Sequence, residues 1–338
     1  MDIVIVDPHD EDVLASWHGV LHAVDQADRP ATADTWSLDE VRAELRQDSG
    51  YWRRLAFVAR DAGRTVGAAW LALSLQDNRH RGELFVAVLP SARRRGVGTA
   101  LLDHLEDIAR TEGRTVAGAE SDWPTVAGPK GAGWPGPEFL AGRGYEQVLL
   151  DVQRRLSLPV PSGLLDELAA QAGAHTDGYE LRSWVGPVPE EHVAGWAALD
   201  ASLETEAPTG GLDLEPRAAA IAKVREDEQL FAAQGRTSYA TVALDAAGEV
   251  VAYTQIARSR DGTGKAYQEG TLVRRDHRGH RLGLAVKVAN LRLLQDAGLG
   301  DVDRLVTYNA ASNEHMIAVN EALGFRVVEW AGEFQKRL

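Results

Sequence analysis

Hydrophobic positions along the chain follow two periods, one typical of strands and one typical of amphipathic helices. Leu55–Ala59 is an apolar run, and a turn containing Gly63 separates it from a second run that begins at Thr65. Two such runs around a tight turn predict a β-hairpin. Within Gly98–Arg110 the apolar residues instead recur three and four positions apart, which places them on one face of a helix. These residues are Leu101, Leu102, Leu105, Ile108 and Ala109.

The hairpin pattern occurs twice, which indicates an internal duplication. Ala240–Leu244 and Ala246–Ala252 repeat it 185 positions later. An ordered series of matches at one offset is the mark of a repeat. Near the end of each half, Gly144-Tyr145 corresponds to Gly324-Phe325 at an offset of 180. The offset of 185 relates Gly63, Val66, Val88, Arg93 and Gly98 to Gly248, Val251, Val273, Arg278 and Gly283.

The two halves have the same predicted order of elements. Each opens with a strand and helical segments, continues through the hairpin and a further strand, and then enters a loop that begins a strong helix. A fifth strand, a helix and a Gly-aromatic step close each half. Residues 157–163 are rich in Pro, Gly and Ser, as linkers often are. We therefore predict domains at 1–157 and 164–338 joined by a linker at 158–163, in the α+β class of mixed α/β folds.

Composition narrows the functional class. The chain has 338 residues, of which 44% are hydrophobic, and its formal net charge is −14. The surplus of acid argues against binding nucleic acid and favours cationic ligands. Without cysteine the chain has no disulfide, thiolate metal site or cysteine nucleophile, and its histidines have no metal-ligand spacing, so no metal is predicted. No basic leader or long apolar run is present, which predicts a cytoplasmic protein without membrane contact.

A basic loop follows the fourth predicted strand of each half. In the first half it reads Arg93-Arg94-Arg95-Gly96-Val97-Gly98, and in the second half Arg278-Gly279-His280-Arg281-Leu282-Gly283. Glycines at a strand-to-helix turn let backbone N–H groups approach a ligand, and the helix N-terminus adds partial positive charge. The sequence therefore predicts two pyrophosphate-binding loops.

These loops resemble the signature Arg/Gln-x-x-Gly-x-Gly/Ala of the GNAT superfamily of acyl-CoA-dependent N-acyltransferases. The first loop fits fully, whereas in the second Arg281 stands where the first glycine belongs. The resemblance covers both halves, as in mycothiol synthase, a tandem GNAT enzyme. It implies a mixed, mostly antiparallel twisted sheet in each half, with fourth and fifth strands that run parallel but splay apart. It also implies acetyl-CoA as the co-substrate.

The resemblance places the acetyl-CoA site on the end of the fourth strand, on the loop and on the helix that follows. Backbone N–H groups at or near Val273, or Val88, would polarise the thioester carbonyl. Asn313 matches an Asn that contacts pantetheine in the family. The implied cofactor-binding residues are Leu272, Val273, Arg278, Gly279, His280, Arg281, Leu282, Gly283, Leu284 and Asn313 in the second half, and Val88, Arg93, Arg94, Arg95, Gly96, Val97, Gly98 and Thr99 in the first.

An amine substrate arrives protonated, so a general base is needed. Strict alternation along the fourth strand places Glu269 on the same face as Thr271 and Val273. No carboxylate occupies the matching positions of the first half, because the same alternation directs Glu83 to the opposite face. We therefore assign Glu269 as the base and expect the first half to be catalytically degenerate. The family's usual acid, a Tyr four residues before the closing Gly, is replaced by Asn320 here and by Leu140 in the first half.

Two further assignments complete the predicted site. Tyr308, at the end of the fifth strand, is the nearest substitute for the acid, a water molecule being the alternative, and Asn320 is placed to hydrogen-bond the sulfur. The acceptor is expected to be a small, cationic amine. Acidic residues around Ala207–Gly211 are candidates for binding it, namely Asp200, Glu204, Glu206, Asp213 and Glu215.

The sequence leaves other functions open. The leading prediction is direct acetyl transfer in a ternary complex, because no cysteine is present to carry the acyl group. A non-catalytic acyl-CoA-binding sensor or scaffold is the first alternative, favoured by the missing Tyr. An aminoacyl-tRNA-dependent transferase, a class that also pairs GNAT-like domains, is the second. The chain is expected to be a monomer or a homodimer.

Overall fold

The computed structural model describes residues 1–260 and 262–338, which divide into two compact units. Unit 1 contains Met1–Asp151, Gly210–Glu215 and Val328–Leu338. Unit 2 contains Val152–Thr209 and Pro216–Val327. Each unit is therefore assembled from segments that are distant in the sequence. The predicted division at 158–163 concerns the repeat in the sequence and stays a prediction.

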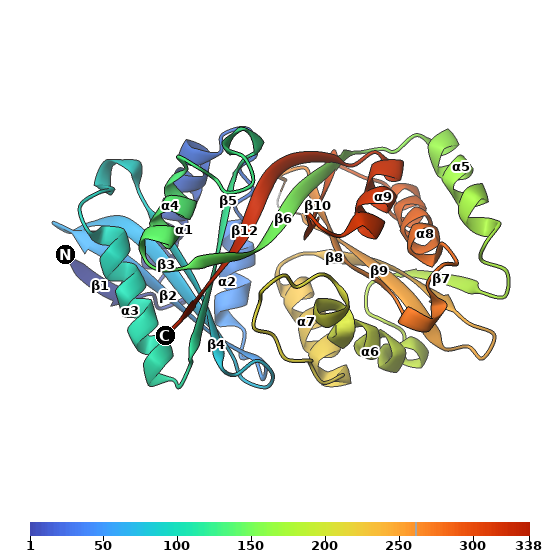
Figure 1. Cartoon of the computed structure of the whole chain (residues 1–338), viewed down its shortest axis with the longest axis horizontal. Helices are drawn as coiled ribbons and strands as arrows, with labels where there is room; N and C mark the ends of the chain where they lie inside the picture. The colour runs from blue at the N-terminus through green and yellow to red at the C-terminus, as the bar shows by residue number, and fades with distance from the viewer. Residues whose placement is uncertain (261) are drawn as a thin grey trace. The chain divides into compact units, whose positions relative to one another are not determined.

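Unit 1 is built on a sheet with the strand order β1-β2-β3-β4-β5-β12 (Figure 1). The C-terminal strand β12 lies antiparallel to β5, with Glu333 opposite Glu120. Strands β4 and β5 are parallel, and the other pairs are antiparallel. The bounds are β1 (Asp2–Ile5), β2 (Trp52–Asp61), β3 (Arg64–Ser74), β4 (Arg81–Val88), β5 (Val116–Pro124) and β12 (Arg326–Arg337).

Helices cover both faces of the unit 1 sheet. α1 (Glu11–Asp28) and α2 (Leu38–Arg46) pack on one face through a core that includes Leu14, Trp17 and Val58. α3 (Val97–Thr111) and α4 (Pro135–Gly142) pack on the other, where Leu101 and Leu105 are fully buried. The predicted helix Gly98–Arg110 is α3. Burial of its apolar stripe against the sheet is the main reason why this segment is helical. Short 3₁₀ turns are formed by Pro90–Ala92 and Thr125–Ala127.

Unit 2 repeats this architecture with the strand order β6-β11-β10-β9-β8-β7. Strands β10 and β11 are parallel, and β7 to β10 form antiparallel pairs. The strand β6 (Glu146–Ser157) contributes its second half to this unit. The other bounds are β7 (Glu180–Val185), β8 (Thr237–Leu244), β9 (Val250–Arg258), β10 (Lys265–Val273) and β11 (Arg304–Ala310).

The helices of unit 2 also form two layers (Figure 1). α5 (Ser162–Gly173), α8 (Leu282–Asp296) and α9 (Glu314–Leu323) share one core with Ile256 and Leu305 of the sheet. α6 (Glu190–Glu206) and α7 (Ile221–Ala233) cover the opposite face, where Trp196 packs on Tyr253 with 4.6 Å between ring centroids. A 3₁₀ turn at Arg275–His277 precedes α8.

The central parallel pair splays apart in both units, as the resemblance implied. In unit 1 the pairing of β4 with β5 runs from Arg81↔Val116 to Leu84↔Ala119 and then stops. In unit 2 the pairing of β10 with β11 stops at Tyr267↔Val306. Beyond these positions, the N–H and C=O groups of β4 and β10 that point toward β5 and β11 form no ladder hydrogen bonds with those strands. The predicted fold class is confirmed.

The predicted linker is packed rather than free. Leu158 and Val160 are buried in the core of unit 2. The side chain of Gln295 accepts a hydrogen bond of 2.6 Å from the Val160 N–H and donates one of 3.2 Å to its carbonyl. Ser162 and Gly163 already belong to α5. Within the described residues, no helix is both long enough and apolar enough to cross a bilayer.

Candidate active site

The two basic loops have the same backbone geometry although their sequences differ. Each has two positions at positive φ, two residues apart. Arg94 (φ +62°) and Gly96 (φ +84°) fill them in the first loop, and Gly279 (φ +90°) and Arg281 (φ +52°) fill them in the second. Arg281 thus adopts the conformation of the glycine that it replaces. Residues that alternate between right- and left-handed conformations direct successive N–H groups to one side and form an anion-binding nest.

Other side chains of the loops divide into buried and exposed groups. Val97, Leu282 and Leu284 are buried and anchor the first turn of each helix. Arg94, Arg95 and Arg281 are exposed, as are Gly96, Gly279 and His280. The ring of His280 lies 5.4 Å from that of Tyr179. Gly98, Thr99 and Gly283 are partly buried in the first turns. Arg278 is exposed as well, so each loop has two exposed guanidinium groups beside its nest, which suits a ligand with several negative charges.

The first arginine of each loop is held by neighbouring groups. Arg278 donates 2.8 Å to Glu206 and 3.2 Å to the Val273 carbonyl. Arg93 makes the equivalent contacts with Asp28 and with the Val88 carbonyl. Asn313 caps α9 by accepting a hydrogen bond of 3.2 Å from the Met316 N–H. The side chains of Arg93, Arg278 and Asn313 are therefore engaged within the protein.

A β-bulge in β10 overturns the assumption of strict alternation in this strand. The register against β9 shifts between Gln268 and Thr271. Both side chains reach Thr254, because Gln268 donates 3.0 Å to its hydroxyl and the Thr271 hydroxyl lies 2.7 Å from it. Two residues three positions apart thus share one face, which a regular strand does not allow. Glu269 lies within the bulge, so the argument that grouped it with Thr271 and Val273 is wrong.

Glu269 belongs to the α6/α7 side of the sheet. Loss of hydration raises the pKa of its carboxyl group, the positive charge of Arg236 lowers it, and the negative charge of Asp227 raises it again. Asp227 is on α7, and Arg236 lies just after this helix, with its guanidinium 4.9 Å from the ring centroid of Tyr267. The net effect is a raised pKa. A carboxylate with a raised pKa is a better general base near neutral pH.

The first half also has a carboxylate on the equivalent face, contrary to the expectation. Glu83 lies opposite Ala72 in the sheet, and Leu71 and Leu73 on either side of Ala72 belong to the α3 core. Glu83 therefore faces α1 and α2. It is paired with Arg81, which lies 2.9 Å away. The halves differ in the partner of this carboxylate: an arginine neutralises Glu83, whereas in the described part of the chain no ion pair is formed by Glu269.

The two residues assigned to the leaving thiolate, Asn320 as a hydrogen-bond partner of the sulfur and Tyr308 as the proton donor, lie on opposite faces of the sheet. Asn320 is fully buried between α8, α9 and β11, where its amide accepts 2.8 Å from Lys287 and donates 3.2 Å to Asn309. Tyr308 alternates with Asn309 along β11, is 43% exposed and shares the α6/α7 side with Glu269. Its hydroxyl accepts a hydrogen bond from Gln153. Glu269 and Tyr308 thus come from adjacent, splayed strands and share one face.

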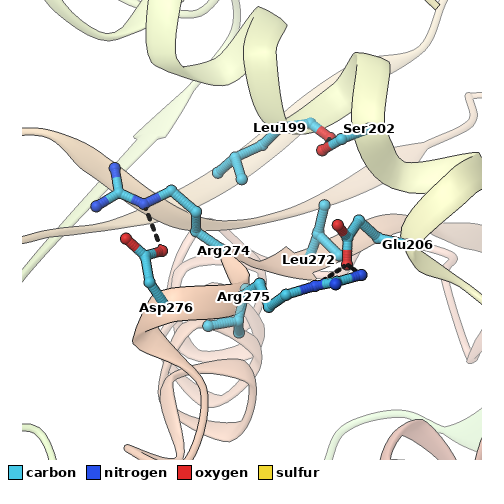
Figure 2. Close-up of a pocket in the computed structure, with 8 residues that line it drawn as sticks. Leu199, Ser202, Glu206, Leu272, Arg274, Arg275 and Asp276 are labelled. Atoms are coloured by element: carbon cyan, nitrogen blue, oxygen red, sulfur yellow. Dashed lines mark hydrogen bonds and ion pairs between the residues drawn. The ribbon is translucent and has the colours of Figure 1, made fainter. Parts of the chain in front are cut away.

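A cavity of about 290 Å³ lies between the end of α6 and the end of β10. Figure 2 shows Leu199 and Leu272 on its walls, with Glu206 directed toward Arg275 and Arg274 toward Asp276. The closest contacts in these pairs are 3.3 and 2.8 Å. The cavity has an apolar interior and a charged rim next to the basic loop. Its lining residues are Leu199, Ser202, Glu206, Leu272, Val273, Arg274, Arg275 and Asp276.

The acidic residues proposed for the acceptor do not form one cluster. Asp200 and Glu204 pair with Arg217 at 3.7 and 3.5 Å, and Glu206 pairs with the basic loop. Asp213 and Glu215 belong to unit 1, where both approach His80. Among residues 1–260 and 262–338, no group of three or more His, Asp or Glu residues is arranged to hold a metal ion.

Sequence reasoning missed Tyr253, Gly270 and Lys287, and it assigned Glu206 to the acceptor without its contact to Arg278. The buried Tyr253 hydroxyl lies so close to Gly270 that a Cβ there would be only 2.3 Å away. A glycine within a strand often marks such a close approach or a bulge, so this signal was present in the sequence. Glu206 and Lys287 carried no comparable signal, because their partners lie far away along the chain.

Comparisons with known proteins agree with this architecture. Residues 21–121 match the model of the Acetyltransferase (GNAT) family. The chain is 30% identical over 272 residues to a mycothiol acetyltransferase of Paenarthrobacter aurescens (strain TC1), covering 78% of this chain and 72% of that protein. It is 27% identical over 246 residues to a mycothiol acetyltransferase of Sanguibacter keddieii, covering 71% and 69%.

Solved structures show the same likeness across the whole chain. A tandem GNAT protein from the clavulanic acid biosynthesis pathway superposes with a TM-score of 0.80 at 28% identity, covering 99% of this chain and 98% of that one. A GCN5-related N-acetyltransferase from Sphaerobacter thermophilus superposes with a TM-score of 0.66 at 16% identity, covering 99% and 95%, and so shares the fold. The predicted tandem GNAT architecture is confirmed.

Proposed function

We propose that this chain, which belongs to the GNAT family of N-acetyltransferases, moves an acetyl group from acetyl-CoA to an amine of a small cationic molecule. The observation that carries the proposal is the arrangement in unit 2. A nest of backbone N–H groups lies at the end of β10, and Glu269, with its raised pKa, lies in a bulge of the same strand. The loop at the C-terminal end of β10 is thus suited to binding phosphates, and Glu269 in the middle of the strand is suited to accepting a proton from the amine.

The loop residues would hold the diphosphate of acetyl-CoA. The backbone N–H groups of residues 279–283 form the nest, and the exposed Arg281 adds positive charge. The partial positive charge at the N-terminus of α8 acts in the same direction. Beyond the bulge, the edge of β10 that faces β11 is unpaired, so its N–H groups near Val273 are available to polarise the thioester carbonyl.

Glu269 is the proposed general base. An amine is a nucleophile only after it loses a proton, and a carboxylate with a raised pKa accepts that proton at lower cost near neutral pH. Tyr308 is the proposed donor to the departing thiolate, because it is exposed on the same face. Direct attack by the amine on the thioester accounts for the transfer without an enzyme-bound acyl group, in keeping with the absence of cysteine.

The negative charge of the protein supports a cationic acceptor. The formal net charge is −14, while the basic residues of the loops are concentrated where phosphates are proposed to bind. A surplus of negative charge elsewhere raises the local concentration of positively charged molecules. The relatives named mycothiol acetyltransferase make an amine on a small thiol-containing molecule a sensible first substrate to test.

The test is a turnover assay with acetyl-CoA and a panel of small amines. Released CoA carries a free thiol, and the protein has no cysteine, so for amines without a thiol a thiol-reactive chromophore reports turnover without protein background. For a thiol-containing amine, loss of the thioester absorbance of acetyl-CoA reports turnover instead. Amine-dependent thiol release that is lost in Glu269→Gln supports the proposal. Acetyl-CoA binding without turnover on any amine would favour the sensor instead, and no binding at all would contradict both.

A further inference from the structure

The first arginine of the second loop joins three elements of unit 2. Arg278 donates through Nε to the carbonyl of Val273, the last residue of β10, at 3.2 Å. Its Nη2 donates 2.8 Å to Glu206, the last residue of α6. Arg275 reaches the same carboxylate oxygen at 3.3 Å. The strand end, the helix end and the loop are thus connected through one guanidinium group.

Unit 1 contains the same construction. Arg93 donates through Nε to the carbonyl of Val88, the last residue of β4, at 3.0 Å. Its two Nη atoms donate 2.8 and 2.7 Å to both carboxylate oxygens of Asp28, the last residue of α1. The acid differs between the halves, Asp in one and Glu in the other, yet each is the last residue of a helix on the equivalent face of its sheet, α1 in unit 1 and α6 in unit 2. The arrangement therefore occurs independently in each half of the chain.

These contacts engage two of the guanidinium groups that the sequence assigned to phosphate, through all three nitrogens of Arg93 and through two of the three nitrogens of the partly exposed Arg278. A carboxylate that accepts one or two charge-assisted hydrogen bonds competes with phosphate for the same donors. The residues that immediately follow, Arg94 and Gly279, are the first positive-φ positions of the two nests. A side chain fixed at this point determines where the next N–H groups are directed. The arginine is thus suited to shaping the nest.

We infer that Arg93 and Arg278 are positioning residues, and that Asp28 and Glu206 fix the backbone of the phosphate-binding loops through them. Phosphate is then left to the backbone N–H groups of the nests and to the exposed Arg94, Arg95 and Arg281. This inference rests on the proposed binding of acetyl-CoA. It adds a role for the C-terminal ends of α1 and α6, which lie outside the loops themselves.

The two possible roles of Arg278 make opposite predictions for Glu206→Gln. If Arg278 is a positioning residue, loss of the Glu206 carboxylate loosens the loop, and acetyl-CoA binds roughly two- to fivefold more weakly, the range expected for a partly exposed ion pair. If Arg278 binds phosphate directly, the same variant frees its guanidinium, and binding stays equal or becomes tighter. Calorimetric titration with acetyl-CoA measures this difference.

A double-mutant cycle with Arg278→Met sharpens the test. For a positioning pair, the double variant binds about as weakly as either single variant, because each change breaks the same contact. If Arg278 binds phosphate directly, Arg278→Met and the double variant bind more weakly, whereas Glu206→Gln alone does not. Glu191→Gln is the matched control, since it removes one negative charge from the exposed first turn of the same helix.

Hydrogen exchange of the free protein separates this inference from the proposed function. The amides of residues 275–283 should exchange faster in Glu206→Gln than in wild type, and those of residues 91–98 faster in Asp28→Asn, while Glu191→Gln changes neither. Unchanged exchange in both variants would overturn the inference even if acetyl-CoA binds. A wild-type protein that does not bind acetyl-CoA would instead contradict the proposed function and leave the exchange result as the decisive evidence on the loops.

Discussion

The ammonium group of Lys287 donates a hydrogen bond of 2.8 Å to the amide oxygen of Asn320, and both side chains are buried. The Lys287 Nζ also lies 5.4 Å from the ring centroid of Phe325. Within the described residues no carboxylate pairs with this lysine. The Asn320 amide in turn donates a hydrogen bond to the side-chain oxygen of Asn309, which also accepts one of 3.2 Å from Arg154. A buried cation is thus satisfied by an amide in place of an acid.

The first prediction concerns the pH dependence of stability. Burial lowers the pKa of Lys287 to about 7 from its usual value near 10.5. The unfolded chain therefore binds the extra proton between about pH 7 and 10.5, so stability due to this residue rises with pH over that range. Urea unfolding at pH 7 and 9.5 should show wild type gaining about 1–3 kcal/mol relative to Lys287→Met.

Lys130→Met is the control for this experiment, since Lys130 is exposed. Its stability difference from wild type should be the same at both pH values. An equal response to pH in wild type and Lys287→Met would show that the buried lysine does not titrate in this range.

The second prediction concerns Glu269. A general base must be deprotonated, so the rate should rise with pH through the pKa of Glu269, which desolvation places above its usual value. Glu269→Gln should lower kcat by about 10²–10⁴-fold and abolish this rise, with little change in acetyl-CoA affinity. Full pH–rate profiles of both proteins provide the measurement. Retention of wild-type kcat would rule out Glu269 as the base.

The third prediction concerns the backbone of the second loop. Arg281 holds φ at +52°, a region that costs a non-glycine residue about 1 kcal/mol or more. Arg281→Gly should therefore leave the free energy of unfolding unchanged or raise it by up to about 1 kcal/mol, since glycine also gains freedom in the unfolded chain. Gly279→Ala, at φ +90°, should lower it by a similar amount. The urea midpoint of Gly279→Ala should fall, whereas that of Arg281→Gly should rise or stay the same.

The fourth prediction concerns Glu120 and Glu333, which lie directly opposite each other on β5 and β12. Desolvation and the facing carboxyl group of Glu120 raise the pKa of the half-buried Glu333 from 4.5 to about 10. Because this folded-state pKa exceeds that of the unfolded chain, the contribution of Glu333 to stability is fully present below about pH 4.5 and is lost as pH rises toward about 10.

Glu333→Gln should therefore raise Tm relative to wild type at pH 8 and have little effect at pH 4. Exposed Glu146→Gln in β6 is the control and should not change the pH dependence. If the Tm difference between Glu333→Gln and wild type were the same at both pH values, titration of Glu333 would not affect the stability of the folded protein.

Local pattern was sufficient to predict much of each unit. The helical spacing of Leu101 and Leu105 predicted α3, and their burial confirms it. The ordered matches at an offset of 185 predicted a duplicated architecture, and the splayed parallel pairs appear in both units. These features depend on residues within one or two turns or strands of each other, so periodicity and turn chemistry report them directly.

The sequence by itself determined the duplication, the elements and the two basic loops. Tertiary structure decided how they are combined: that Val328–Leu338 completes the sheet of the first unit, that a bulge places Glu269 with the α6/α7 side, and that Arg278 meets Glu206. These outcomes depend on contacts between residues 72 to more than 200 positions apart, or on a single inserted residue that reverses strand parity. Neither leaves a periodic signal in the chain, because packing and charge pairing are selected only once the layers have come together.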